Sequence, residues 1–374
     1  MIIRESCYFC TSSFQIFAIL AIAIERKESA DLYIDPQFAD AESLCGRIRK
    51  IGIFENVIVV DWRKICEKYL TKGPGFLNHL QIINSYIHVE KIVKLILLQE
   101  VNYKNIFLSS KAFMPRMVLF SFIKKNMPIH PFYFDDGTGS YENNRAYRIK
   151  FSDKVIRRLL FGKKANCTNY ERYLFSPSIY YELNDKTDID IISIKRFWEN
   201  PHGEDIINRV FGINQKPMIE ESLIILDQPK DELFTSENIE SINNIYNRFV
   251  DTIGYENSVI KKHPRSSSED FKNIKYFETN GIPFELYCLN VNMTNKILIS
   301  YSSTAVATPK ILFDQEPIVI VLTKLIKPIT GEKNLFEDFF NAVKRAYRNP
   351  KRFMIPSNMD ELIQIISMLN SNQE

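Results

Sequence analysis

Short apolar runs that suit buried strands alternate along this chain with segments of helical apolar spacing, and this alternation constrains the fold more than any other feature. The first strand is expected at Ile2–Cys10, and an apolar helix is expected at Phe14–Ile24. Further segments of both kinds follow: strands at Ala30–Ile34, Val57–Val60, Ile106–Leu108 and Pro131–Phe134, and helices at Ile83–Leu98 and Ala112–Lys125. Strands that alternate with helices form a parallel sheet with helices on both faces.

A second set of such segments follows an irregular middle region. The alternation weakens between about Arg145 and Pro217 and resumes at Ser222–Leu226. Later strands are expected at Ser258–Lys261, Lys296–Ser300 and Ile318–Leu322, and helices at Glu237–Asp251, after Ser302, at Phe336–Tyr347 and at Asp360–Leu369. At 374 residues the chain is longer than one core usually supports. We therefore expect an α/β chain of two Rossmann-like domains with a cleft between them, at residues 1–150 and 217–374. Residues 151–216 are expected to be a connecting region, either peripheral or part of a dimer interface.

Charge, apolar content and cysteine spacing exclude several classes of protein. The chain carries 48 lysines and arginines against 45 aspartates and glutamates, a net charge of +3, so no nucleic-acid partner is expected. The apolar run Phe14–Ile24 is shorter than the roughly 20 residues that span a membrane, and it leads into charged residues rather than a cleavage site. Cys7 and Cys10 lie in an apolar strand, and no second pair has zinc spacing. Buried thiols in a reducing cytoplasm are expected.

Four polar clusters follow expected strands, at the position where open parallel sheets bind ligands. They are Asp135-Asp136-Gly137, residues 227–232 (D-Q-P-K-D-E), Lys261-Lys262-His263-Pro264 and Ser300-Tyr301-Ser302-Ser303. His263 stands between two lysines and a rigid proline, which suits a phosphate site, although a surface turn explains the same residues. Ser302 and Ser303 precede an expected helix, where hydroxyls, free backbone N–H groups and the helix dipole can bind an anion or simply cap the helix.

Carboxylates in these clusters are candidate general bases, and one acidic triplet elsewhere is a candidate metal site. Asp136 and the pair Asp227 and Asp231 follow expected strands, but turns account for the same residues. Asp188-Ile189-Asp190 fits the D-x-D pattern of metal-dependent transferases. It lies in the irregular middle region, and such triplets arise often by chance in a chain with 45 acidic residues. We expect no metal site there.

In this order the clusters resemble the motifs of the bacterial lipooligosaccharide and capsule sialyltransferases, glycosyltransferase family 52. The family's acidic-acidic-glycine motif matches Asp135-Asp136-Gly137, its histidine–proline motif matches His263-Pro264, and its serine motif matches Ser302-Ser303. The opening Cys10–Gln15 is similar to the family's first strand–turn–helix, with Ser12-Ser13 in place of the usual proline pattern. The resemblance spans about residues 5 to 310, and its specificity lies in the order and spacing of short motifs.

The resemblance implies a GT-B fold, with the first domain on the acceptor side and the second binding the nucleotide. It implies an inverting transfer of sialic acid from CMP-sialic acid to a terminal sugar hydroxyl of a bacterial surface glycan: lipooligosaccharide, O-antigen or capsule. No cofactor or metal is implied, since the donor has a single phosphate. His263 would act as general acid or phosphate-binding group, and Glu285 would bind the ribose. Asp231 would be the general base, with Asp227 second and Asp136 also retained. The remaining nucleotide-binding residues would be Lys261, Pro264, Ser302 and Ser303.

Other functions remain open on the sequence. A CDP-glycerol glycerophosphotransferase would explain His263 and Ser302-Ser303 but not the acidic clusters; a UDP-sugar transferase and a non-catalytic nucleotide-binding subunit are further alternatives. The expected partners are a nucleotide-sugar donor and a lipid-linked glycan at the inner face of the membrane. The stretch Arg145–Lys164 mixes basic and apolar residues, and Lys154, Arg157 and Arg158 could form the polar face of an amphipathic helix on an anionic membrane. Packing of the apolar positions inside the protein or across a homodimer explains the same pattern and is slightly favoured.

Overall fold

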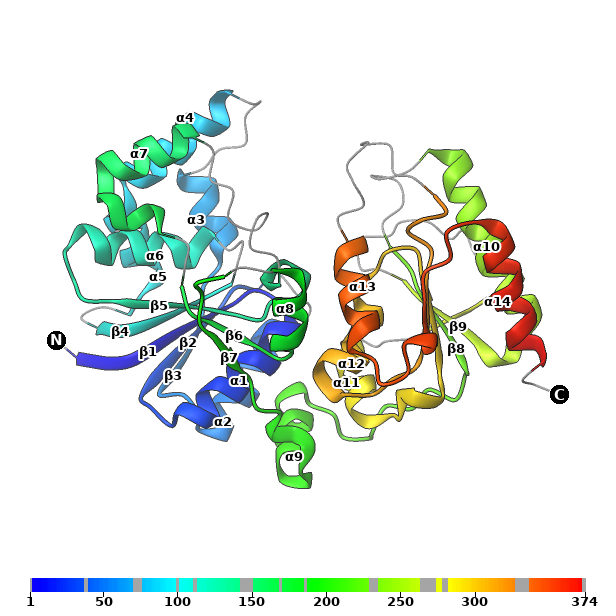
Figure 1. Ribbon diagram of the computed structural model, residues 1–374. Helices are drawn as coiled ribbons and strands as arrows, with labels where there is room; N and C mark the ends of the chain where they lie inside the picture. The colour runs from blue at the N-terminus through cyan, green and yellow to red at the C-terminus, as the bar shows by residue number, and fades with distance from the viewer. Residues whose placement is uncertain are drawn as a thin grey trace. The chain divides into compact units, whose positions relative to one another are not determined.

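The computed structural model describes residues 2–36, 40–69, 76–98, 101–109, 113–141, 151–167, 170–184, 187–228, 235–262, 274–277, 282–326 and 336–371. The chain divides into two compact units, Met1–Asn214 and Gln215–Glu374, each built on its own parallel sheet (Figure 1). None of the helices in these ranges is long and apolar enough to cross a membrane.

The first unit is a seven-stranded sheet with strand order β3-β2-β1-β4-β5-β6-β7, in which every neighbouring pair is parallel. The strands are β1 (Ile2–Cys10), β2 (Ala30–Ile34), β3 (Asn56–Val59), β4 (Val101–Leu108), β5 (His130–Phe134), β6 (Arg172–Leu174) and β7 (Ile191–Ser193). The helices are α1 (Ser13–Arg26), α2 (Ala41–Ile51), α3 (Trp62–Tyr69), α4 (Phe76–Ile87), α5 (Val89–Ile96), α6 (Phe113–Lys124), α7 (Phe151–Phe161), α8 (Pro177–Leu183) and α9 (Pro201–Phe211). The strand order reverses between β1 and β4.

Burial explains why the first two segments are so apolar. β1 lies at the centre of the sheet, and its residues from Cys7 to Cys10 are fully buried, which confirms the expected buried thiols. Helix α1 begins where the Ser12 hydroxyl accepts a hydrogen bond from the Gln15 N–H, and it ends at Lys27 in the left-handed conformation. Its residues from Gln15 to Ala23 are all buried, so the apolar run is a core helix, as expected.

Residues 151–216, expected to connect two domains, instead contain five elements of the first unit. β6 and β7 extend its sheet, and α9 packs against α2, where the Arg47 guanidinium donates to the Val210 carbonyl at 2.7 Å. The two strands have three residues each, which is too short to show an alternating pattern in the sequence.

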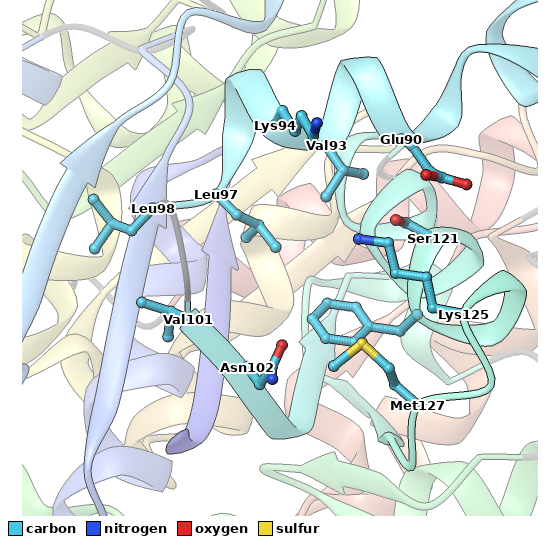
Figure 2. Close-up of a pocket in the computed structure, with 11 residues that line it drawn as sticks. Glu90, Val93, Lys94, Leu97, Leu98, Val101, Asn102, Ser121, Lys125 and Met127 are labelled. Atoms are coloured by element: carbon cyan, nitrogen blue, oxygen red, sulfur yellow. The ribbon is translucent and has the colours of Figure 1, made fainter. Parts of the chain in front are cut away.

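A cavity of about 400 Å³ opens at the amino end of β4, between α5 and α6 (Figure 2). Apolar side chains such as Val93, Leu97 and Phe122 line it together with Lys94 and Lys125. It lies at the amino end of β4, whereas the Asp135-Asp136-Gly137 cluster of the same unit follows the carboxyl end of β5, and none of the expected site residues lines it.

The second unit is a six-stranded parallel sheet with strand order β10-β9-β8-β11-β12-β13. The strands are β8 (Leu223–Leu226), β9 (Ser258–Lys261), β10 (Lys275–Tyr276), β11 (Ile297–Ser300), β12 (Ile318–Val321) and β13 (Phe353–Met354). The helices are α10 (Ser236–Ile253), α11 (Phe284–Asn290), α12 (Thr308–Phe313), α13 (Glu337–Ala346) and α14 (Met359–Ser371). The order reverses between β8 and β11. One core cluster joins Ile225 and Ile299 of the sheet to Phe249 of α10 and Leu362 of α14.

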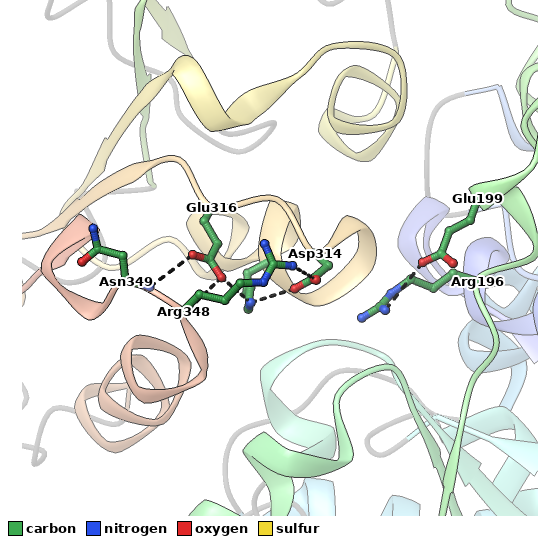
Figure 3. Close-up of polar contacts among 7 residues, drawn as sticks. Arg196, Glu199, Asp314, Glu316, Arg348 and Asn349 are labelled. Carbon is green, nitrogen blue, oxygen red and sulfur yellow. Dashed lines mark hydrogen bonds and ion pairs between the residues drawn. The ribbon is translucent and has the colours of Figure 1, made fainter.

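A buried ionic cluster joins the end of α12 to the segment after α13 (Figure 3). The Lys310 ammonium lies 2.6 Å from the Glu316 carboxylate and 2.7 Å from that of Asp314. Glu316 also accepts the backbone N–H of Arg348 at 2.9 Å, and Arg348 pairs with Asp314. Lys310 and Glu316 are both buried, so each charge depends on the other.

Each unit is a parallel sheet covered by helices with a single reversal of strand order. The chain therefore has the α/β, two-domain Rossmann-like fold of the GT-B type, and the expected fold class is confirmed.

Candidate active site

Three of the four polar clusters begin at the ends of β9, β8 and β11, which are neighbouring strands of the second sheet. β8 lies between β9 and β11, with Leu226 paired to Lys261 and Ile225 paired to Ile299. Asp227, Lys261 and Ser300 therefore stand at the same carboxyl edge, and the Asp227 N–H donates to the Lys261 carbonyl at 3.0 Å. The strand order reverses between β8 and β11, which is where open α/β sheets bind ligands.

Hydrogen bonds tie the loops after β8 and β11 together at this edge. The buried Ser300 hydroxyl donates to the Leu226 carbonyl at 2.6 Å and accepts the Ser303 N–H at 2.9 Å. The Ser302 hydroxyl donates to the Gln228 side-chain oxygen. The Ser303 hydroxyl accepts the Ala305 N–H at 3.4 Å, so this serine caps the turn that follows.

The element after Ser303 is not the single helix that the sequence predicts. Thr304–Ala307 forms a 3₁₀ turn, and α12 begins only at Thr308. The hydroxyls of Ser302 and Ser303 already have protein partners. A bound phosphate would have to share or replace these hydrogen bonds.

The charges of Lys261 and Glu285 influence each other's pKa. Burial lowers the pKa of the Lys261 ammonium, and the Glu285 carboxylate opposes this effect. Burial likewise raises the pKa of Glu285, which lies in the first turn of α11, and the Lys261 charge opposes it. The next lysine turns elsewhere, because the Lys262 ammonium lies 4.1 Å from the centre of the Tyr276 ring. A partly desolvated cation at a strand end is suited to an anionic ligand.

Several expected site residues lie outside the described part of the chain. These are Asp231, His263 and Pro264. Their segments start directly after Gln228 and Lys262, which stand at the carboxyl edge of the second sheet. Asp227 lies in the described part of the chain and is only 4% exposed. Its charge helps to raise the pKa of the Tyr246 hydroxyl, which burial raises most. Asp227 therefore offers little surface to a substrate.

The fourth cluster belongs to the first unit and forms a tightly bonded loop after β5. The Asp135 carboxylate is fully buried and accepts the Tyr141 hydroxyl at 2.5 Å, the Gly137 N–H at 3.0 Å and the Phe175 N–H at 3.3 Å. Gly137 has φ 107° and ψ −157°, a conformation that only glycine adopts readily. Burial raises the pKa of Asp135 to about 7, although these hydrogen bonds oppose it.

Asp136 is the accessible carboxylate of this loop. It is partly exposed, its Oδ1 accepts the Ser140 hydroxyl at 2.6 Å, and its N–H donates to the same hydroxyl oxygen at 2.9 Å. Asp135 therefore orders the loop from inside, while Asp136 keeps surface that a substrate can reach.

Arg172 and Asn184 support this loop, and neither was expected from the sequence. Arg172 in β6 is 1% exposed, donates to the Ser140 carbonyl at 3.0 Å, and lies 5.2 Å from the centre of the Tyr180 ring. Asn184 donates to the Tyr141 carbonyl at 2.8 Å. The available signal was a single arginine before an apolar run, Arg172-Tyr173-Leu174-Phe175, because an arginine there must have buried partners.

The D-x-D triplet, Asp188-Ile189-Asp190, does not belong to any of the four polar clusters. Asp188 and Asp190 are exposed at the start of β7, and the Asp190 carbonyl accepts the Arg172 N–H at 2.9 Å. Among the described residues, no three His, Cys, Asp or Glu side chains gather as a metal site requires.

Residues 7–322 match the family model for alpha-2,8-polysialyltransferases. The chain belongs to this family. It is therefore a glycosyltransferase of a sialyltransferase family, and the expectation of a sialyltransferase is confirmed at that level. The match covers both sheets from β1 to β12 and all four polar clusters.

Comparisons with whole proteins give only distant similarity. No curated protein matches the chain by sequence. Among solved structures, the chain is similar to a calicheamicin glycosyltransferase (9% identity, 100% of this chain and 95% of the other, TM-score 0.44). It is also similar to the S. aureus MnaA–UDP complex (10%, 98% and 97%, 0.47) and to a UDP-glucosyltransferase from Polygonum tinctorium (7%, 98% and 98%, 0.45).

Proposed function

We propose that this protein transfers sialic acid from CMP-sialic acid to a hydroxyl of a glycan, with inversion at the anomeric carbon and without a metal. The observation that carries this proposal is the meeting of Asp227-Gln228, Lys261 and Ser300–Ser303 at the strand-order reversal of the second sheet, in a chain of a sialyltransferase family. That edge offers the Lys261 cation and the Ser302 and Ser303 hydroxyls, whose present hydrogen bonds an anionic ligand would share or replace. A single phosphate needs no metal bridge between two phosphates.

The nucleotide half of the site is assigned to the second unit. Lys261, Ser302 and Ser303 would hold the phosphate, and Glu285 would bind the ribose hydroxyls. His263, with Pro264 fixing the backbone beside it, would bind or protonate the leaving phosphate. Charge grows on this phosphate as the glycosidic bond breaks, so preorganised donors lower the barrier. A phosphate next to Lys261 would also offset the burial that lowers the pKa of this lysine.

The acceptor half needs a base that removes the hydroxyl proton. Asp231 is the first choice and Asp136 a second, because Asp136 is partly exposed. Asp227 is less suited because it is nearly buried. Attack on the face opposite the leaving CMP passes through an oxocarbenium-like state and inverts the anomeric centre in one displacement.

The acceptor is proposed to be a lipid-linked bacterial surface glycan: lipooligosaccharide, O-antigen or capsule. The name of the matching family favours, within this set, a glycan that already ends in sialic acid. The motif resemblance to lipooligosaccharide sialyltransferases favours a neutral terminal sugar instead. A panel of labelled acceptors with either terminus, followed by product sizing, separates single transfer from chain extension.

A donor screen tests the reaction itself. Purified protein is incubated with CMP-sialic acid, CDP-glycerol and UDP-sugars, and release of each nucleotide is measured with and without acceptor. The proposal expects release from CMP-sialic acid alone. Release only from CDP-glycerol or a UDP-sugar would replace the proposal, and binding of CMP without turnover would indicate a non-catalytic subunit.

Two neighbouring lysines provide a matched test of the nucleotide site. Lys261→Ala should weaken CMP binding roughly 10- to 100-fold in calorimetry, the usual value of one charge-assisted hydrogen bond. Lys262→Ala removes an equal charge one residue away, but this ammonium lies over Tyr276, so the affinity should change much less. Equal losses in both variants would show that the phosphate does not lie against Lys261.

A further inference from the structure

Helix α7 presents an apolar pair to solvent on one face. Leu159 is 79% exposed, more than any other large apolar side chain in the described part of the chain, and Val155 is 42% exposed. The two are four residues apart and so lie on the same side of the helix. Leu160 beside them is 37% exposed. Single apolar residues are common on protein surfaces, but adjacent ones on one helix form a patch.

Basic side chains surround this patch. Lys154 and Arg158 are exposed next to Val155 and Leu159, and Lys163 and Lys164 are exposed in the 3₁₀ turn that packs against α7. Residues 154–167 contain no acidic residue. The patch therefore combines cations with apolar side chains, and no carboxylate lies among them within residues 154–167.

The opposite face of α7 anchors the helix to the first unit, and it holds one residue that was expected at the surface. Arg157 is only 7% exposed, donates to the Tyr86 hydroxyl at 2.9 Å and pairs with Asp153 at 2.7 Å. Its guanidinium lies 5.2 Å from the centre of the Phe120 ring, on which Phe161 stacks. The expectation that Arg157 faces a membrane is wrong, because hydrogen bonds and aromatic contacts hold it inside.

We propose that the exposed face of α7, with Lys154, Val155, Arg158 and Leu159 as its centre, docks on an anionic lipid surface. Apolar side chains interleaved with cations suit the boundary between acidic headgroups and acyl chains. There the apolar side chains insert among the acyl chains, and the cations pair with the headgroups. In a dry protein interface, the four cations Lys154, Arg158, Lys163 and Lys164 would instead repel one another unless the partner supplied acidic residues. The site does not depend on the proposed sialyl transfer, since binding needs no substrate.

Vesicle sedimentation with the full chain tests this surface. The vesicles contain phosphatidylcholine alone or mixed with phosphatidylglycerol, at low and high salt. One variant combines Lys154→Gln, Arg158→Gln, Lys163→Gln and Lys164→Gln, and a second combines Val155→Gln with Leu159→Gln. The control combines Ile363→Gln with Lys351→Gln, an exposed apolar and an exposed basic residue of the second unit.

The proposal expects wild type to bind only the anionic vesicles, and high salt to weaken that binding. Each basic residue near such a surface contributes about fivefold in affinity, so the charge variant should lose at least tenfold and most of its salt dependence. The apolar variant should also lose at least tenfold and keep its salt dependence, whereas the control should bind like wild type. Absence of wild-type binding at low salt, or equal binding by all variants, would overturn the proposal. So would a dimer, seen by light scattering, that the apolar variant dissolves.

Discussion

The buried carboxyl of Asp135 makes folding depend on pH in a way that one substitution can expose. Its ordinary pKa of 3.8 is raised to about 7 by burial. A carboxyl with a higher pKa in the folded state binds more protons when folded, so its contribution to stability is present at low pH and is lost as the pH rises from about 4 to 7. Three pKa units at about 1.4 kcal/mol each amount to about 4 kcal/mol.

Asp135→Asn removes this titration and keeps a side chain of the same shape. The variant loses part of the hydrogen bonding to Tyr141, Gly137 and Phe175, which is an offset that does not depend on pH. The stability of the variant relative to wild type should therefore rise by about 4 kcal/mol between pH 4 and pH 8. For a domain of this size that is a relative change of roughly 10 °C in the unfolding temperature.

Thermal unfolding of both proteins at half-unit steps of pH measures the effect. Tyr141→Phe serves as a second variant. The hydrogen bond from the Tyr141 hydroxyl lowers the pKa of Asp135, so without it the loss of stability should continue to a higher pH than in wild type. Parallel profiles of wild type and Asp135→Asn from pH 4 to pH 8 would refute the reasoning, because they would mean that Asp135 ionises as easily in the folded chain as in the unfolded one.

Four other outcomes are expected. His263→Ala should lower turnover roughly 10²- to 10⁴-fold with little change in unfolding temperature, and near-normal turnover would make this histidine a turn residue. EDTA should leave activity intact; loss of activity restored by Mg²⁺ or Mn²⁺ would require a metal. Arg157→Gln should cost about 3 kcal/mol in unfolding free energy because Asp153 loses its ion pair and keeps the Tyr86 hydroxyl, whereas the exposed Arg158→Gln should cost less than about 0.5 kcal/mol. Burial opposes ionisation of Glu316, but hydrogen bonds from Arg348 and Lys310 hold its pKa below the ordinary value. Its contribution is therefore present above about pH 4.5 and lost in acid, so the stabilities of wild type and Glu316→Gln should converge as the pH falls.

The apolar pattern predicted the elements whose surroundings are uniformly apolar. The strands expected at Ile2–Cys10, Ala30–Ile34 and Ser258–Lys261 occur with those bounds, and α1 and α10 begin and end within a few residues of the predicted limits. The long helix expected at Ile83–Leu98 is instead two helices, α4 and α5, that meet at His88. Periodicity alone does not register such a break, since apolar positions continue on both sides of it.

The candidate site was likewise predicted in part: its position was expected from the sequence, and most of its side-chain contacts were not. The sequence located the polar clusters because each follows a strand of recognisable pattern, and it predicted that Ser302-Ser303 and Lys261 would stand at one edge. It left open whether these serines bind an anion or cap the following turn, and Ser303 does cap it. It did not predict that Ser302 donates to Gln228, or that Arg172 supports the loop of Asp136. Gln228 and Arg172 lie 74 and 32 residues from the groups they contact, so these contacts form only when the strands pair.

The sequence by itself therefore determined most of the strands and helices, the position of each cluster after its strand, and the family to which those motifs are similar. These features depend on neighbours within a few residues. The tertiary structure alone decided that β8 lies between β9 and β11, that residues 151–216 complete the first sheet, and that Arg157 is buried while Arg158 is exposed. The reason is that strand order and burial depend on contacts between segments that are distant in the sequence. Two adjacent residues of equal charge can therefore differ, one facing a packed core and the other facing solvent.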